Sequence, residues 1–135
     1  MNQDEIEFVI PRRPVSLQAR TKGLQAWKKY VAHEVTKQYQ ASTPISNTEL
    51  QCTIVYLSGA NPPDIDNIIK PIQDALIGII YDDDIQIHDV DSHRRPLETP
   101  FDFLALPKLL KKAVCNGKEC VYIRISQSKK LEEYI

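Results

Sequence analysis

A chain of 135 residues, 42% of them hydrophobic and 26% charged, is predicted to fold as one globular domain over residues 1–135. It has no run of about 18 apolar residues and begins with the acidic segment MNQDEIEF, which argues against a membrane span and a signal peptide and leads us to expect a cytoplasmic protein. Three cysteines, an odd number, argue against a disulfide framework.

The charge is unevenly distributed along the chain, although its sum is only −1. Residues 1–44 carry 7 basic and 4 acidic groups, residues 45–107 carry 3 basic and 11 acidic groups, and residues 108–135 carry 7 basic and 3 acidic groups. An acidic middle between two basic ends suits a metal site flanked by a phosphate-binding surface. Chance segregation of charge on a solvated surface is the alternative.

Hydrophobic periodicity predicts the element order β-α-β-α-β-α-β, an α/β (α+β) fold with one mixed sheet and flanking helices. The first strand covers residues 5–10, and a basic loop rich in proline follows at residues 11–20. The first helix covers residues 23–40, with lysines opposite its apolar stripe. The basic loop could hold phosphates, or it could be an exposed loop with no partner. The candidate phosphate contacts are Arg12, Arg13, Arg20, Lys22, Lys28 and Lys29.

The second strand, residues 49–58, is apolar on both faces in its later part, which predicts a central position in the sheet. After GANPP breaks the strand, the second helix is expected to run from Asn67 to Ile80. Pro71 has no N–H to donate, so the first turn of this helix should be irregular or shifted. The remaining predicted elements are a turn at 81–84, a strand at 84–91, a loop at 93–100, a helix at 106–115 stopped by Asn116-Gly117, and a strand at 120–125.

Carboxylates are densest in residues 62–90, where they would repel one another without a cation among them. A divalent cation such as Mg²⁺ is the simplest candidate, because it takes oxygen ligands. We expect Asp64 and Asp66, which follow the central strand, to meet Asp83 and Asp84, which enter the next strand, at one end of the sheet. The alternative is structural: Asp64 or Asp66 caps the helix, and residues 82–84 form a polar turn.

Mg²⁺ can polarise a phosphodiester oxygen, activate water and stabilise a leaving oxygen. Lys70 lies one helical turn beyond Asp66, where its ammonium could neutralise transition-state charge or orient water. A helix ion pair of Lys70 with Asp66 or Asp74, worth about 0.2–0.5 kcal/mol, is the competing interpretation. The chain has no EF-hand loop, no GxxxxGK[ST] loop and no GxSxG motif, so other acidic, nucleotide-binding and covalent mechanisms are not favoured.

The run DIDNIIKPIQDALIG followed by YDDDIQI resembles the signature of the RusA family of Holliday junction resolvases. FVIPRRPVSLQAR resembles that family's opening strand and loop, and VYIRIS resembles its last strand. The resemblance implies a RusA-like, homodimeric endodeoxyribonuclease that uses Mg²⁺, or Mn²⁺ in its place, to cut four-way DNA junctions in recombination and repair. The six basic residues named above would then contact DNA.

By motif match, the resemblance implies that Asp64, Asp66 and Asp84 are the catalytic aspartates and hold the metal. Lys70 would give catalytic support, and Asp83 would lie beside the metal as a further ligand. Two other functions remain open on the sequence alone. One is a less selective structure-dependent nuclease that acts on flaps, forks or RNA. The other is a DNA-binding or regulatory homologue without catalysis.

Overall fold

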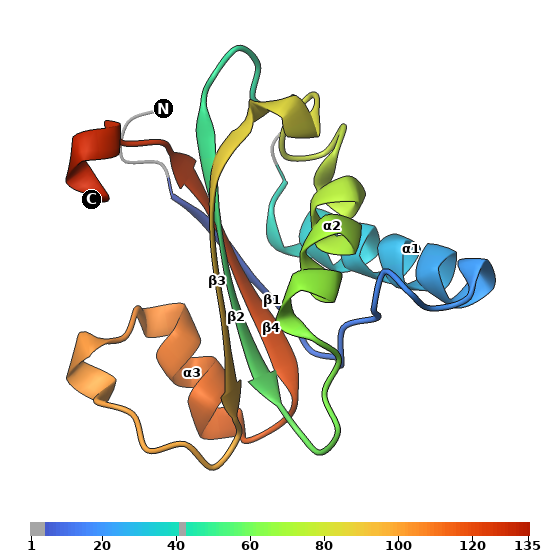
Figure 1. The fold of residues 1–135 in the computed structure, drawn as a ribbon, viewed down its shortest axis with the longest axis vertical. Helices are drawn as coiled ribbons and strands as arrows, with labels where there is room; N and C mark the ends of the chain where they lie inside the picture. The colour runs from blue at the N-terminus through green and yellow to red at the C-terminus, as the bar shows by residue number, and fades with distance from the viewer. Residues whose placement is uncertain (1–4, 41–42) are drawn as a thin grey trace.

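The computed structural model describes residues 5–40 and 43–135 and contains one four-stranded mixed sheet with helices on both faces (Figure 1). This arrangement confirms the predicted fold class. The strands are β1 (Ile6–Ile10), β2 (Leu50–Ser58), β3 (Ile87–Pro96) and β4 (Cys120–Gln127), and the helices are α1 (Thr21–Gln38), α2 (Ile65–Leu76) and α3 (Lys108–Asn116). None of the helices in this described part of the chain is long and apolar enough to cross a membrane.

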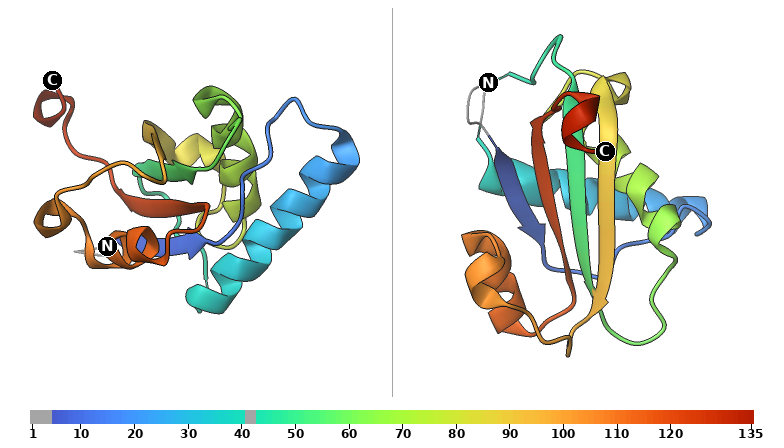
Figure 2. Two further views of the ribbon diagram at one scale, coloured as in Figure 1. Left: turned by 90° about the horizontal axis from the view of Figure 1, so that it is seen from below. Right: turned by 60° about the vertical axis from the view of Figure 1, so that its left-hand side comes forward.

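The strand order across the sheet is β1-β4-β2-β3, as the face-on view shows from blue through red and green to gold (Figure 2, right). β4 pairs antiparallel with both β1 and β2, whereas β2 and β3 are parallel. The predicted central position of β2 is therefore confirmed. In the parallel pair Leu50 lies beside Ile87 and Ser58 beside Pro96, so the end of β2 and the start of β3 lie at opposite ends of the sheet.

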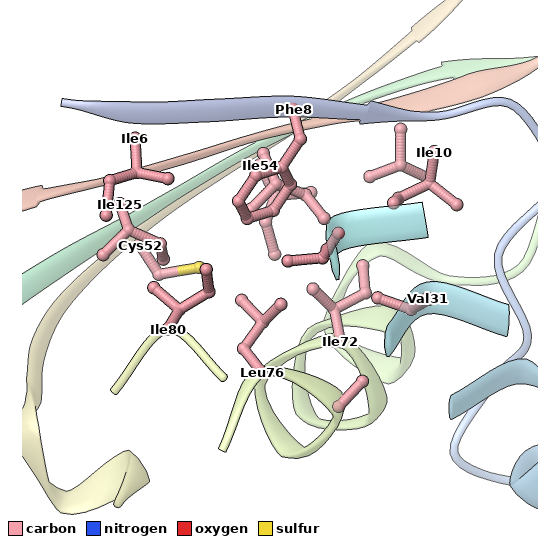
Figure 3. Packing of buried hydrophobic residues seen from close by; sticks show 14 of the residues in the cluster. Ile6, Phe8, Ile10, Val31, Cys52, Ile54, Ile72, Leu76, Ile80 and Ile125 are labelled. Atoms are coloured by element: carbon pink, nitrogen blue, oxygen red, sulfur yellow. The ribbon is translucent and has the colours of Figure 1, made fainter. Parts of the chain in front are cut away.

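Helices α1 and α2 cover one face of the sheet, and the larger hydrophobic core lies between them and the strands (Figure 3). Every second residue of β1 is buried here, as an amphipathic strand requires. Phe8, Ile54, Ile72 and Leu76 have no exposed surface. Burying each such side chain contributes about 1.5–3 kcal/mol, so this core fixes α2 firmly against the sheet.

Helix α3 covers part of the opposite face, where a smaller core joins Leu57 and Tyr122 of the sheet to Leu110 and Ala113 of the helix. Figure 1 shows this helix on the other side of the sheet from α1 and α2. α3 ends at Gly117, which has the left-handed φ of 67°. The predicted glycine stop of this helix is thereby confirmed.

Helix α2 begins two residues earlier and ends four residues earlier than predicted, at Ile65 and Leu76. Pro71 consequently lies inside the helix, and the carbonyl of Asn67, four residues before it, has no N–H partner from the proline. The backbone N–H of Leu17, in the loop after β1, donates to that carbonyl at 2.7 Å. The β1–α1 loop thus docks on the start of α2 through the carbonyl that Pro71 leaves without a helical partner.

The prediction that Asp84 opens a strand is wrong, and so is the prediction of a loop from residue 93. A short 3₁₀ helix, η1 (Asp84–Gln86), precedes β3, and β3 then continues to Pro96. β3 is an edge strand that pairs only with β2, and most of its residues are partly or fully exposed. A strand in that position does not need the alternating apolar pattern on which the prediction relied.

Candidate active site

The first turn of α2 presents two carboxylates to solvent. Asp64 is the N-cap residue, but its side chain makes no capping hydrogen bond. Its carboxylate is exposed and accessible to a ligand from solvent. Asp66 lies in the first turn and is also exposed. The positive end of the helix dipole stabilises negative charge at both positions. The structural interpretation of Asp64 as a side-chain cap is therefore not supported.

Lys70 bridges α2 and the turn before β3. Its Nζ lies 2.9 Å from Oδ1 of Asp74, one turn along the helix, and 2.5 Å from Oδ2 of Asp84. On the far side of Asp74, Nζ of Lys28 in α1 approaches Oδ2 at 3.4 Å. We call Lys28, Asp74, Lys70 and Asp84 the charge row, because basic and acidic groups alternate along it.

The charge row keeps Lys70 positively charged. Its hydrogen bond to Asp84, and then that to Asp74, raise the pKa of Lys70 well above its ordinary value. The same hydrogen bond from Lys70 lowers the pKa of Asp84. Lys70 is thus a fixed ammonium and not a general base, and Asp84 is a fixed carboxylate.

The helix ion pair of Lys70 with Asp74 that competed with a catalytic role is present. The contact with Asp84, 14 residues further along the chain, is not explained by helical spacing. A lysine that needed only an intrahelical partner would not require that second carboxylate. The pairing across two elements therefore points to a role beyond helix stability.

The triple aspartate is organised by a residue that the sequence analysis missed, Gln86. Its Oε1 accepts hydrogen bonds from the backbone N–H groups of Asp82 and Asp83 at 3.0 and 3.1 Å, and its Nε2 donates to the carbonyl of Ile45 at 3.1 Å. Oδ1 of Asp83 accepts from the N–H of Ile85 at 3.1 Å, which completes a capping box. The spacing Asp-x-x-Gln is the signal that could have identified this box.

The two pairs of aspartates do not meet at one end of the sheet, which corrects the prediction. Because β2 and β3 are parallel, the residues after β2 and those before β3 start at opposite ends, and α2 spans the distance between them. The link between the two groups is Lys70, midway along α2, which reaches Asp84 from the helix. Asp64 and Asp66 at the start of α2 are thus connected to Asp84 through Lys70 of the same helix, and not through the end of the sheet.

The donor chemistry of the exposed carboxylates fits a hard divalent ion. Mg²⁺ is commonly held by one or two carboxylates, with water and substrate phosphates as the other ligands, and Asp64 and Asp66 meet that need. Within residues 5–40 and 43–135 there is no group of three or more His, Cys, Asp or Glu side chains placed to hold a metal ion. The four predicted ligands, Asp64, Asp66, Asp83 and Asp84, thus form no ready-made cage, and their role as ligands stays a prediction.

The six predicted DNA contacts fall into two groups. Three have partners within the chain: Arg12 stacks on the ring of Tyr30 at 4.0 Å, Arg13 binds the loop after β2, and Lys28 belongs to the charge row. The others are exposed on the β1–α1 loop and on α1; these are Arg20, Lys22 and Lys29. The second group offers the freer cations for phosphate, and the assignment of all six stays a prediction.

The loop between β2 and α2, which leads into Asp64, is held by Arg13. The guanidinium donates to the carbonyl of Asn61 at 2.8 Å and to the carbonyl of Ala60. Its Nε also lies 3.1 Å from Oε2 of Glu119, which directly precedes β4. Neither contact was predicted, because Glu119 stands 106 residues from Arg13 and no local motif marks it.

Glu119 also receives hydrogen bonds from the hydroxyl of Tyr56 and the backbone N–H of Gly59. Burial alone would raise the pKa of this carboxyl, but the hydrogen bonds from Tyr56, Gly59 and Arg13 outweigh burial and lower the pKa below its ordinary value. The ionised form of Glu119 is therefore the one that the fold stabilises.

This pKa shift predicts a pH-dependent contribution to stability. A folded-state pKa below the unfolded value stabilises the fold at pH above the ordinary value of 4.5, and this contribution is lost as the pH falls below it. The difference in free energy of unfolding between the wild type and Glu119→Gln should therefore be largest near neutral pH and shrink in acid. Urea denaturation at a series of pH values measures it. A difference that stayed constant with pH would contradict the stabilised carboxylate.

Comparison with known protein families identifies the family of the chain. The family model described as Endodeoxyribonuclease RusA matches residues 12–100, about two thirds of the chain. The matched segment runs from the β1–α1 loop to the residues just after β3 and includes Asp64, Asp66, Lys70 and Asp84. No curated protein matches the chain significantly. Since the family model covers well over half of the sequence, the chain belongs to the RusA endodeoxyribonuclease family.

Proposed function

We propose that the protein is a Mg²⁺-dependent, structure-specific endodeoxyribonuclease that resolves four-way (Holliday) junctions in DNA recombination and repair. Membership of the RusA family supports endodeoxyribonuclease activity. The observation that carries the finer proposal is the ion pair of Lys70 with Asp84, on the same helix whose first turn exposes Asp64 and Asp66. The site of action would be the cytoplasm, and the substrate would be branched DNA.

Each residue of the site has a defined task in this proposal. Asp64 and Asp66 would hold the ion, together with Asp84 and its neighbour Asp83. An Mg²⁺ ion held there, or Mn²⁺ in its place, would supply Lewis-acid polarisation of a phosphate oxygen and a lowered pKa of bound water. Lys70, protonated throughout the physiological pH range, stabilises the negative charge that grows on the phosphate oxygens.

A homodimer would place two such sites on one four-way junction, so that the two opposing strands are cut. Two-fold symmetry would also double the exposed cations around the DNA. Arg20, Lys22 and Lys29 are exposed cations of the β1–α1 loop and of α1, and they would bind phosphates in a salt-dependent manner.

The test is cleavage of synthetic DNA with labelled strands. Four-way junctions, forks, flaps, duplex and single strands of matched sequence are incubated with the protein and Mg²⁺, Mn²⁺, Ca²⁺ or EDTA. We expect paired nicks in the junction with Mg²⁺ or Mn²⁺, little cleavage of duplex or single strands, and none in EDTA. Size-exclusion chromatography with light scattering reports the dimer.

The same experiment separates the competing functions. Equal cutting of flaps, forks and junctions would indicate a less selective nuclease. Binding that weakens steeply with salt but never leads to cleavage, with any of these ions, would indicate a non-catalytic homologue. Cleavage that persisted in EDTA would contradict the role of the metal.

A further inference from the structure

We propose that Arg13, Glu119 and Arg94 are positioning residues that hold the β2–α2 loop so that Asp64 and Asp66 face the substrate. This inference rests on the proposed function, because it concerns the same carboxylates. It assigns Arg13 a task inside the protein in place of the DNA contact that its basic loop suggested. We call the three side chains, together with the carbonyls that they bind, the loop clamp.

The first part of the clamp is the double contact of Arg13. Its guanidinium donates to two successive carbonyls, those of Ala60 and Asn61, and its Nε faces Glu119. Asn61 has a positive φ of 52°, a left-handed turn conformation that asparagine adopts more readily than most other residues. A planar guanidinium with donors in a fixed fork can bind such a pair of carbonyls, which an ammonium cannot do equally well.

The second part is Glu119, which locks Arg13 in place. Its carboxylate, 21% exposed, takes hydrogen bonds from Arg13, from the hydroxyl of Tyr56 and from the backbone N–H of Gly59. A Cβ at Gly59 would lie only 3.1 Å from Oε1 of Glu119, so a side chain here would push the carboxylate aside by a few tenths of an ångström. Glu119 therefore ties the central strand β2, the loop and Arg13 together.

The third part holds the other end of the loop. Nη1 of Arg94, on the edge strand β3, donates to the carbonyl of Pro63 at 3.1 Å, directly before Asp64. On the opposite side, the N–H of Leu17 donates to the carbonyl of Asn67 at 2.7 Å, directly after Asp66 in the first turn of α2. The segment that carries Asp64 and Asp66 is thus fastened before and after the two carboxylates.

These contacts favour positioning over DNA binding for Arg13. Its donors already serve two carbonyls and a carboxylate, and a phosphate would have to break that set. Arg20, in the same basic loop, is exposed and serves as the natural comparison. A shift of about 1 Å in a catalytic group can cost about 10²-fold in rate, so a loosened loop should reduce the rate without weakening the binding of DNA.

The experiment compares three clamp variants with matched controls. The clamp variants are Arg13→Gln, Glu119→Gln and Gly59→Ala. Gly23→Ala is the control for the glycine, because a Cβ there would meet no atom within 4 Å. Lys118→Gln controls for a charge change beside Glu119, since Lys118 is exposed. Arg20→Gln represents a cation of the loop that is expected to contact DNA.

Four quantities are measured for each variant: the single-turnover cleavage rate of a four-way junction, the Kd for that junction in Ca²⁺, the affinity for Mn²⁺ without DNA by electron paramagnetic resonance, and Tm. We expect each clamp variant to lower the cleavage rate by about 10- to 100-fold and to weaken Mn²⁺ binding, with an unchanged junction Kd. Arg20→Gln should raise the Kd for the junction and make the affinity less dependent on salt concentration, while Mn²⁺ binding stays intact.

Three results would overturn the clamp. Arg13→Gln could raise the Kd for the junction and leave the affinity for Mn²⁺ unchanged, which would make Arg13 a phosphate contact. The clamp variants could match the wild type in rate and Mn²⁺ affinity. The cleavage rates of the clamp variants could also fall only in proportion to their Tm while their affinity for Mn²⁺ stayed normal. The three side chains would then contribute to stability alone. A wild type that cut no DNA would refute the proposed function alone, and the Mn²⁺ affinities of the same variants would still decide the clamp.

Discussion

Asp66→Asn is expected to abolish cleavage of a four-way junction by lowering the rate about 10³-fold, equivalent to about 4 kcal/mol of transition-state stabilisation. Asp66 presents its carboxylate in the first exposed turn of α2, and asparagine has the same size without the charge that a divalent ion needs. Loss of favourable charge at the helix start should cost only about 0.3–1 kcal/mol of stability. Single-turnover cleavage and urea denaturation measure the two effects separately.

Asp82→Asn is the matched control for this experiment. Asp82 belongs to the same acidic stretch and is exposed, but its carboxylate accepts a hydrogen bond from the hydroxyl of Ser46 at 2.5 Å and lies outside the proposed ligand set. Its replacement should leave cleavage near the wild-type rate. If Asp66→Asn still nicked junctions at the wild-type rate, Asp66 would have to be removed from the catalytic group.

Lys70→Met is expected to lower the cleavage rate by about 10²- to 10³-fold, the usual cost of removing one preorganised positive donor. Methionine keeps much of the length of the lysine side chain and deletes the ammonium that links Asp74 and Asp84. The ion pairs are half exposed at Lys70, so their loss should change stability by only about 0–1 kcal/mol. The affinity for Mn²⁺ should not weaken, because Asp84 loses a competing cation.

Lys37→Met provides the comparison for Lys70. Lys37 is an exposed helical lysine with an ion pair of its own, 3.2 Å from Glu34 three residues earlier, and it has no task in the proposed reaction. Its loss should cost a similar small amount of stability and leave cleavage intact. If both lysine variants cleaved junctions equally well, Lys70 would be a helix ion pair and nothing more.

Much of the fold follows from local patterns in the sequence. Three predictions depend only on residues close together in the sequence, and each agrees with the structure. They are the alternating burial of β1, the apolar central strand β2 and the glycine stop after α3. The aspartates and Lys70 were identified from charge density and from a family signature, both of which are also local. The charged residues of the candidate site could thus be predicted from the sequence, but their arrangement in space could not.

The rest depends on contacts between residues far apart in the chain. β3 is stabilised by its pairing with β2, so its polar residues give no strand signal of their own. Pro71 was placed inside the predicted helix, but the donor that replaces its missing N–H, the backbone of Leu17, lies in a distant loop and gave no local signal. Arg13 was interpreted as a phosphate ligand because its carboxylate partner, Glu119, lies at the far end of the sequence.

The central position of β4 has a consequence for the timing of folding. The strands β1, β2 and β3 leave the ribosome first, yet β1 has no neighbour in the sheet until β4 is inserted between it and β2. Closure of the sheet must therefore await the last strand to be synthesised, and Glu119 arrives immediately before it. A nascent chain that still lacks residues 119–127 therefore has neither the central strand β4 nor the carboxylate of Glu119 that pairs with Arg13, and the loop clamp can be completed only after these residues have been synthesised.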